Sequence, residues 1–143
     1  MHNLFADIKP FCDQTFEKDG HRIYYEQSGN PNGIPVCVVH GGPGGGSTAK
    51  LRSFFNPNDY HIIMFDQRGC GQSRPHAKLE NNTLHELMND MEYIRNKLNI
   101  KKWMLFGGSW GTTLSLIYAQ TYPDNVSAMI LRGVFLAREQ DYK

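Results

Sequence analysis

The sequence predicts an α/β fold in which a mostly parallel β-sheet carries helices on both faces. Two observations support this prediction. Short, nearly continuous apolar runs alternate along the chain with segments whose apolar residues recur at helical spacing. Loops that carry glycines follow three of the apolar runs, and in such sheets binding sites form beyond the carboxyl ends of the strands.

The first half of the chain predicts four strands. Residues 14–29 form two of them around the dipeptide Asp19-Gly20, which is the most compact hairpin signal in the chain. Residues 35–40 and 60–66 are short apolar runs, as expected of strands that are buried on both faces.

A long helix is predicted over residues 82–100. Thr83 and Glu86 make the capping-box pattern at its start. The apolar residues that follow share helical spacing: Leu84, Leu87, Met91, Ile94 and Leu98.

The last part of the chain continues the alternation. A strand is predicted over residues 102–107, a helix over 110–122 that ends near Pro123, and a further strand over 127–133. The chain contains no internal repeat, low-complexity tract or linker. Residues 1–143 are therefore expected to belong to a single domain.

Composition excludes several classes of function. The formal net charge of +1 gives no electrostatic reason to bind nucleic acid or an anionic membrane. No apolar run approaches the ~20 residues that span a bilayer, and the N-terminus lacks the pattern of a signal peptide. Cys12, Cys37 and Cys70 cannot all pair and none lies in a CxxC motif, which favours reduced thiols in a cytoplasmic protein.

The glycine-rich loop from Gly41 to Gly46 is open to three interpretations. A P-loop is disfavoured, because Ser47 stands where the phosphate-binding lysine should be between Gly46 and Thr48. A dinucleotide fingerprint fits Gly44-x-Gly46-x-x-Ala49, but a proline interrupts these glycines and a hairpin precedes the strand. The third interpretation is a flexible surface turn, although so many glycines after a buried strand would give up an unusual amount of backbone order.

A second glycine motif favours nucleophilic catalysis. Gly107-Gly108-Ser109-Trp110-Gly111 is a G-x-S-x-G sequence between a predicted strand and a predicted helix, the context that a nucleophile elbow requires. The turn is so tight that Gly107 and Gly111 must lack side chains. Ser109 would then point its hydroxyl out above the sheet, at the N-terminus of the following helix.

The elbow gives the first loop a role. In a nucleophile-elbow enzyme, one oxyanion donor is the N–H of the residue after the serine, here Trp110. The second comes from a histidine–glycine loop, here His40-Gly41-Gly42, and we assign it to the Gly42 N–H. His40 is expected to join neighbouring loops rather than to act as the catalytic base.

Three motifs in order, HGGPGGG, DQRGCGQS and GGSWGTTLSLIYAQTYP, resemble the proline iminopeptidases of the α/β-hydrolase fold. The resemblance runs from roughly Phe11 to Phe135. It implies that Ser109 is the nucleophile of a serine peptidase that releases N-terminal proline from short peptides through an acyl-enzyme, without metal or cofactor. It also implies that Asp66 and Arg68 brace the oxyanion loop.

The chain departs from that family after Ser109. Family enzymes are about twice as long, with a helical cap and a triad in the order serine, acid, histidine. Here Asp124, Glu139 and Asp141 follow the serine, and all six histidines precede it. We therefore expect the chain to resemble an amino-terminal half, truncated before the cap and the last strands, and to be inactive alone.

Other functions stay open. One is a different α/β-hydrolase activity, such as that of an esterase, whereas epoxide hydrolases and dehalogenases place aspartate at the elbow. Another is a non-catalytic chain that needs a partner polypeptide. Since further strands would add beside residues 127–133 in this fold, we also expect an exposed sheet edge near Ala128 to Leu131 and self-association through it.

Overall fold

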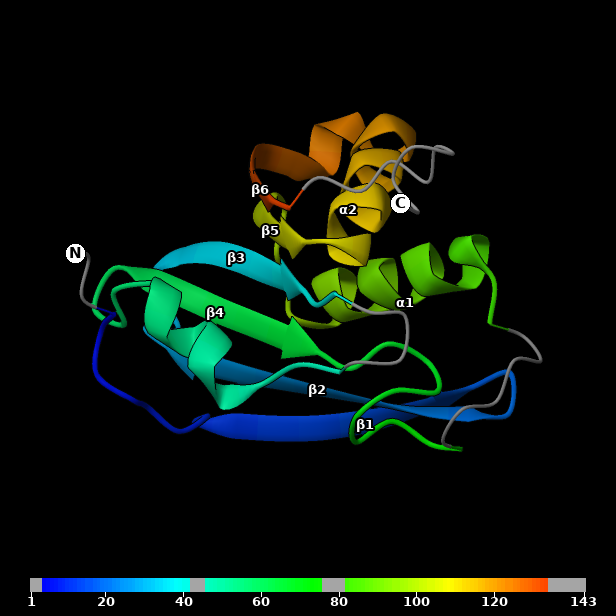
Figure 1. The fold of residues 1–143 in the computed structure, drawn as a ribbon, viewed down its shortest axis with the longest axis horizontal. Helices are drawn as coiled ribbons and strands as arrows, with labels where there is room; N and C mark the ends of the chain where they lie inside the picture. The colour runs from blue at the N-terminus through cyan, green and yellow to red at the C-terminus, as the bar shows by residue number, and fades with distance from the viewer. Residues whose placement is uncertain (1–3, 42–45, 76–81, 134–143) are drawn as a thin grey trace.

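The computed structural model describes residues 4–41, 46–75 and 82–133, which form one sheet with helices packed against it (Figure 1). The six strands are β1 (Cys12–Lys18), β2 (His21–Gly29), β3 (Ile34–Val39), β4 (Tyr60–Phe65), β5 (Trp103–Gly108) and β6 (Val126–Arg132). The α-helices are α1 (Leu84–Lys97) and α2 (Trp110–Thr121), and the 3₁₀ helices are η1 (Ala49–Phe54) and η2 (Pro123–Asn125).

The strand order is β1-β2-β4-β3-β5-β6. β4, β3, β5 and β6 are parallel neighbours, and β1 and β2 add antiparallel strands beside β4. The predicted hairpin between β1 and β2 is confirmed, with Asp19 at φ 54° and Gly20 at φ 80° in its turn. The predicted α/β fold with a mostly parallel sheet is also confirmed.

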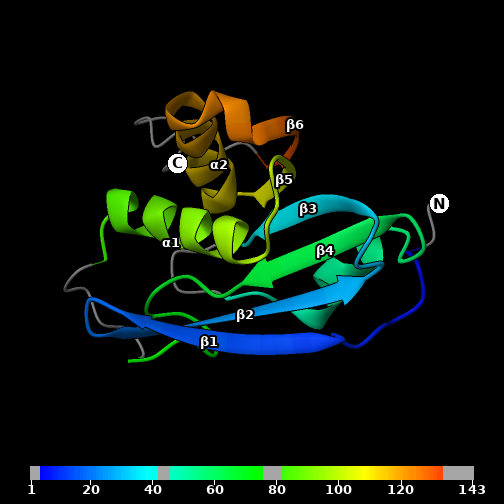
Figure 2. The same cartoon turned by 180° about the vertical axis from the view of Figure 1, so that it is seen from behind.

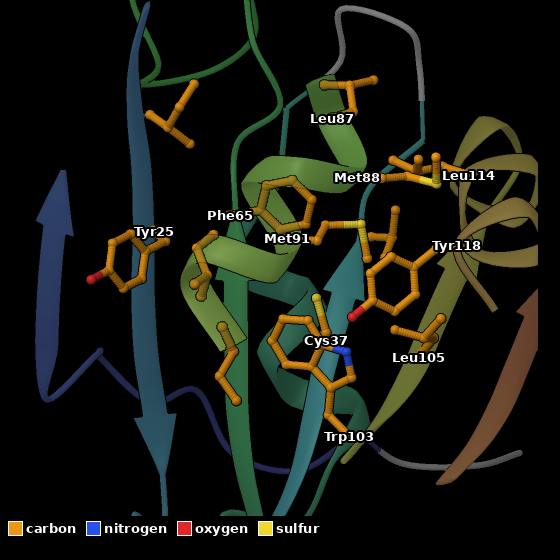
Figure 3. Close-up of a cluster of buried hydrophobic side chains, with 14 of the residues drawn as sticks. Tyr25, Cys37, Phe65, Leu87, Met88, Met91, Trp103, Leu105, Leu114 and Tyr118 are labelled. Atoms are coloured by element: carbon orange, nitrogen blue, oxygen red, sulfur yellow. The ribbon is translucent and has the colours of Figure 1, made fainter. Parts of the chain in front are cut away.

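The continuous apolar runs arise because the central strands are covered on both faces. Along β4, Ile63 and Phe65 belong to one core cluster, whereas Ile62 and Met64 belong to another on the opposite side. The larger cluster lies between the sheet and the two α-helices, with Trp103 fully buried at its base (Figure 3).

The opposite face carries η1 instead of an α-helix. Figures 1 and 2 show η1 and α1 on opposite sides of the sheet. The smaller cluster on the η1 side contains Phe55 and Phe106, with Leu51 and Phe54 of η1 packed against it. Helices therefore lie on both faces, and among the described residues both α-helices share one of them.

The capping box at the start of α1 is confirmed. The Thr83 hydroxyl accepts from the Glu86 N–H at 3.4 Å, and the Glu86 carboxylate accepts from the Thr83 N–H at 2.6 Å. This local exchange begins the helix at Leu84, two residues inside the predicted segment.

β6 is an edge strand of the sheet and pairs with β5 alone among the described strands. Its middle residues are exposed, Met129 by 39% and Ile130 by 42%. Neither described α-helix is long and apolar enough to cross a membrane.

Candidate active site

The strand–turn–helix geometry predicted around Ser109 is present between β5 and α2. Ser109 is the N-cap of α2, and its backbone has φ 54° and ψ −116°. This left-handed conformation is costly for a residue with a Cβ atom, and such strain is concentrated at functional sites. Ser109 is exposed, so it is accessible to a molecule outside the protein.

Close packing explains the glycines on either side of Ser109. A Cβ on Gly107 would lie 2.6 Å from the Gly111 carbonyl oxygen, and a Cβ on Gly111 would lie 2.1 Å from the Val39 carbonyl oxygen. Both distances are too short for a side chain. The elbow therefore presses against the end of β3 and turns sharply over itself.

Two further contacts hold the elbow. The Ser109 N–H donates to the Arg132 carbonyl at the end of β6, at 3.0 Å, and the Thr112 N–H donates to the Ser109 carbonyl. As the first helical residue, Trp110 has a backbone N–H that the helical ladder leaves unpaired. An N–H in this position, together with the helix dipole, can stabilise a negative charge that develops beside Ser109.

The glycine-rich loop begins against the elbow. A Cβ on Gly41 would lie 3.0 Å from the Gly108 carbonyl oxygen and 3.4 Å from Ser109 Cβ, so only a glycine backbone approaches this closely. The Gly42 N–H, assigned above as the second oxyanion donor, lies outside the described residues, and that assignment stays a prediction.

His40 joins the loops at the ends of β3 and β4. Its Nε2 accepts from the Gln67 backbone N–H at 3.0 Å, so Nδ1 carries the proton and donates to the Gly41 carbonyl at 2.7 Å. Burial lowers the pKa of His40, although the Gly41 carbonyl and Asp66 act in the opposite direction. With both nitrogens occupied, His40 is poorly placed to take a proton from Ser109.

Asp66 braces the far side of the glycine-rich loop. Its Oδ1 accepts from the Ser47 N–H at 2.8 Å and from the Ser47 hydroxyl at 2.6 Å, and its Oδ2 accepts from the Gln72 N–H. Gly71, at φ 50°, leaves room for this carboxylate, since a Cβ there would lie 2.4 Å from Oδ2. Asp66 thus holds Ser47, directly after Gly46, and the bracing of the oxyanion loop by Asp66 stays a prediction.

Arg68 binds two other parts of the chain. Its fully buried guanidinium makes two bonds to Asp90 on α1, at 2.7 and 2.8 Å, and one to Asp19 at the hairpin turn. These contacts tie α1 and the hairpin to the loop after β4. The bracing of the oxyanion loop by Arg68 stays a prediction.

Gln67, between these two residues, was not predicted as part of the site. Its Nε2 donates to the His40 carbonyl at 3.0 Å, and its Oε1 accepts from Trp110 Nε1 at 3.1 Å. Its place in the DQRGCGQS motif was the available signal, but a neutral amide does not indicate a partner by its sequence position.

A pocket of about 430 Å³ opens beside Ser109. Leu51 and Phe106 give it apolar walls, and Arg132 lies over the rings of Phe54 and Phe106 at 4.6 and 5.2 Å. The pocket can therefore take a small apolar group next to the nucleophile. Sequence reasoning did not predict these wall residues, because they come from η1, β5 and β6.

No complete triad lies within the described residues. Asp124 belongs to η2, beyond the C-terminal end of α2 and away from Ser109 at its start, and Glu139 and Asp141 lie outside the described residues. Of the described histidines, His40 alone lines the pocket. The same part of the chain contains no cluster of three or more His, Cys, Asp or Glu side chains suited to a metal ion.

The strand–elbow–helix geometry agrees with a family match. Residues 34–142, more than half of the chain, match the alpha/beta hydrolase fold family. The chain belongs to the α/β-hydrolase family. Within α/β-hydrolases, the residue after the serine supplies one oxyanion donor, the position of Trp110.

Several curated relatives of this α/β-hydrolase are proline iminopeptidases. The probable proline iminopeptidase of Leptolyngbya boryana is 51% identical over 142 residues, which cover 99% of this chain and 44% of that protein. The proline iminopeptidase of Xylella fastidiosa (strain Temecula1) is 50% identical, and the alignment covers 96% of this chain and 44% of that protein. The enzyme of Neisseria gonorrhoeae is 54% identical over 121 residues, covering 85% and 39%. The chain thus spans less than half the length of these relatives.

Solved structures share the fold at lower identity. A proline iminopeptidase-related protein from Thermus thermophilus has a TM-score of 0.73 and 23% identity, with 87% of this chain and 44% of that chain covered. An epoxide hydrolase mutant of Vigna radiata has a TM-score of 0.74 and 20% identity, and the superposition covers 88% of this chain and 39% of that chain. These likenesses confirm the α/β-hydrolase architecture.

Proposed function

We propose that this chain carries the nucleophile and oxyanion hole of a serine aminopeptidase that releases N-terminal proline from short peptides. The observation that carries the proposal is the strained Ser109 elbow packed against the His40-Gly41 loop. About 50% identity to proline iminopeptidases over nearly the whole chain supports the substrate class.

The proposed reaction proceeds through an acyl-enzyme. Ser109 Oγ bonds to the carbonyl carbon of the N-terminal proline, and the negative oxygen accepts hydrogen bonds from the N–H groups of Trp110 and Gly42. The C–N bond then breaks, the shortened peptide leaves with a proton, and water hydrolyses the ester to free proline. The apolar pocket beside Ser109 suits the pyrrolidine ring.

A general base must take the Ser109 proton in this reaction. His40 is excluded by its two hydrogen bonds, so we propose a histidine outside the described residues, oriented by an acid. We also propose a cytoplasmic location, because an odd number of cysteines cannot all pair within the chain, and we propose no nucleic acid or membrane partner.

The proposal is tested with a hybrid enzyme. The chain is joined to the part of the Xylella fastidiosa proline iminopeptidase that it does not cover, and the hybrid is assayed with proline p-nitroanilide and with p-nitrophenyl acyl esters. We expect proline release that is abolished in Ser109→Ala, and no useful turnover by the 143-residue chain alone.

Two results would contradict the proposal. Turnover of the acyl esters without proline release would assign the site to an esterase. Proline release that survives Ser109→Ala would remove the serine from the mechanism.

A further inference from the structure

Gln67 occupies an unusual place above the sheet. It follows β4, His40 follows β3, and Ser109-Trp110 follows β5, and these three strands are adjacent in the order β4-β3-β5. The Gln67 side chain therefore reaches across the end of β3 to the elbow. It is 2% exposed, so its contacts are shielded from water.

The two partners of the amide determine its orientation. The Trp110 indole nitrogen can only donate, so it requires an acceptor, and the His40 carbonyl can only accept, so it requires a donor. The Gln67 amide offers one of each, at 3.1 Å and 3.0 Å. A glutamate carboxylate of the same length could accept from the indole but could not donate to the His40 carbonyl.

The backbone of Gln67 adds a third bond. Its N–H donates to His40 Nε2 at 3.0 Å, and His40 Nδ1 in turn donates to the Gly41 carbonyl. One residue is thus bonded both to the loop that enters the oxyanion hole and to the residue that supplies the other donor.

We propose that Gln67 is a positioning residue that sets the distance between the two halves of the oxyanion hole, the His40-Gly41 loop and Trp110. This inference rests on the proposed function for its effect on rate. Oxyanion donors act only when they lie at hydrogen-bond distance from the developing negative charge, and small misplacements at such sites lower rates by up to about 100-fold.

The kinetic test uses the hybrid enzyme described above. Gln67→Met keeps the length of the side chain and removes both amide bonds. Because oxyanion stabilisation is realised in the transition state, kcat for proline p-nitroanilide should fall about 10- to 100-fold while KM stays within about twofold. Trp110→Phe should act similarly, and the double variant should be little slower than either single variant, since both remove the same bridge.

The matched control is Gln27→Met. Gln27 also pairs with a histidine, since its Oε1 lies 2.8 Å from His61 Nε2, but His61 is at the opposite end of β4 from the site. This variant should leave kcat unchanged. If Gln67→Met lowers the melting temperature but leaves kcat within about twofold at 25 °C, Gln67 is merely structural and the inference is wrong.

A spectroscopic test on the 143-residue chain is independent of activity. In a ¹H–¹⁵N spectrum, Gln67→Met should shift both the indole and the backbone N–H signals of Trp110, with the Trp103 indole signal unchanged. If the hybrid releases no proline, the proposed function is wrong. This spectrum still tests whether the hydrogen bonds of Gln67 position the Trp110 backbone. An unmoved Trp110 backbone signal would overturn the inference.

Discussion

At the scale of single residues, the strained backbone of Ser109 lowers the stability of the chain. Its φ of 54° with a Cβ atom costs of order 1–2 kcal/mol, which the packed elbow must offset. Glycine adopts this conformation without that cost. We expect Ser109→Gly to raise the free energy of unfolding by about 1 kcal/mol, measured by urea denaturation. Ser109→Ala, which keeps the Cβ, should show no such gain, and an equal gain in both variants would contradict the strain.

The glycines of the elbow differ in what surrounds them. A Cβ at Gly111 would lie 2.1 Å from the Val39 carbonyl oxygen, whereas one at Gly108 would meet only the Arg132 guanidinium at 3.9 Å. Gly111→Ala should therefore lower the free energy of unfolding by about 3 kcal/mol. Gly108→Ala is the control, with a change within about 0.5 kcal/mol. Equal losses in thermal melts of the two variants would disprove the close packing.

The buried imidazole of His40 makes stability depend on pH. Burial lowers its pKa from the ordinary value of 6.5, so below that pH the unfolded chain binds more protons than the folded one. The free energy of unfolding should therefore fall as the pH drops below about 6.5. The contribution of His40 is at most about 1.4 kcal/mol per pH unit. His61, whose pKa burial also lowers, acts in the same direction.

The measurement compares urea unfolding at pH 7 and at about pH 5. His40→Gln should weaken the pH dependence, although it also lowers stability at pH 7 through lost hydrogen bonds. His85→Gln, at an exposed position on α1, serves as the control and should retain the full dependence. A His40→Gln profile parallel to that of the unmodified chain would refute this assignment.

At the scale of secondary-structure elements, α1 is held at its start by a local cap and in its middle by a buried ion pair. Asp90 on the helix accepts two bonds from Arg68, at the end of β4, and Thr83 caps the first turn. Thr83→Ala should lower the free energy of unfolding by about 1 kcal/mol. Thr48, the N-cap of η1, makes no capping bond, so Thr48→Ala should have almost no effect. Similar losses in denaturant titrations of both variants would argue against the cap.

At the scale of the whole molecule, β6 leaves one side of the sheet open. Its outer backbone groups face no described strand, and its exposed middle residues, Ala128, Met129 and Ile130, are apolar. We propose that the 143-residue chain self-associates by pairing β6 edges. Ile130→Lys, at a side chain 42% exposed, should reduce the association seen by sedimentation over a range of concentrations.

Ile34→Lys tests whether any loss of exposed apolar surface has the same effect. Ile34 is 51% exposed but lies on β3, an inner strand. Self-association should persist in this variant. If the unmodified chain is a monodisperse monomer at all concentrations, the proposed self-association is wrong.

The sequence alone determined the features that local patterns specify. The strands, the hairpin at Asp19-Gly20 and the capping box of Thr83 follow from short-range spacing and turn chemistry. The elbow at Ser109 was also predictable, because the strain of its turn requires small residues at fixed offsets.

Only the tertiary structure decided which polar groups meet. Asp66, Gln67 and Arg68 are consecutive, yet they contact the glycine-rich loop, the elbow and α1 respectively. The pocket walls likewise come from separate elements. Hydrogen-bond partners distant in sequence depend on strand order and on the direction of each side chain, and neither is encoded in local spacing.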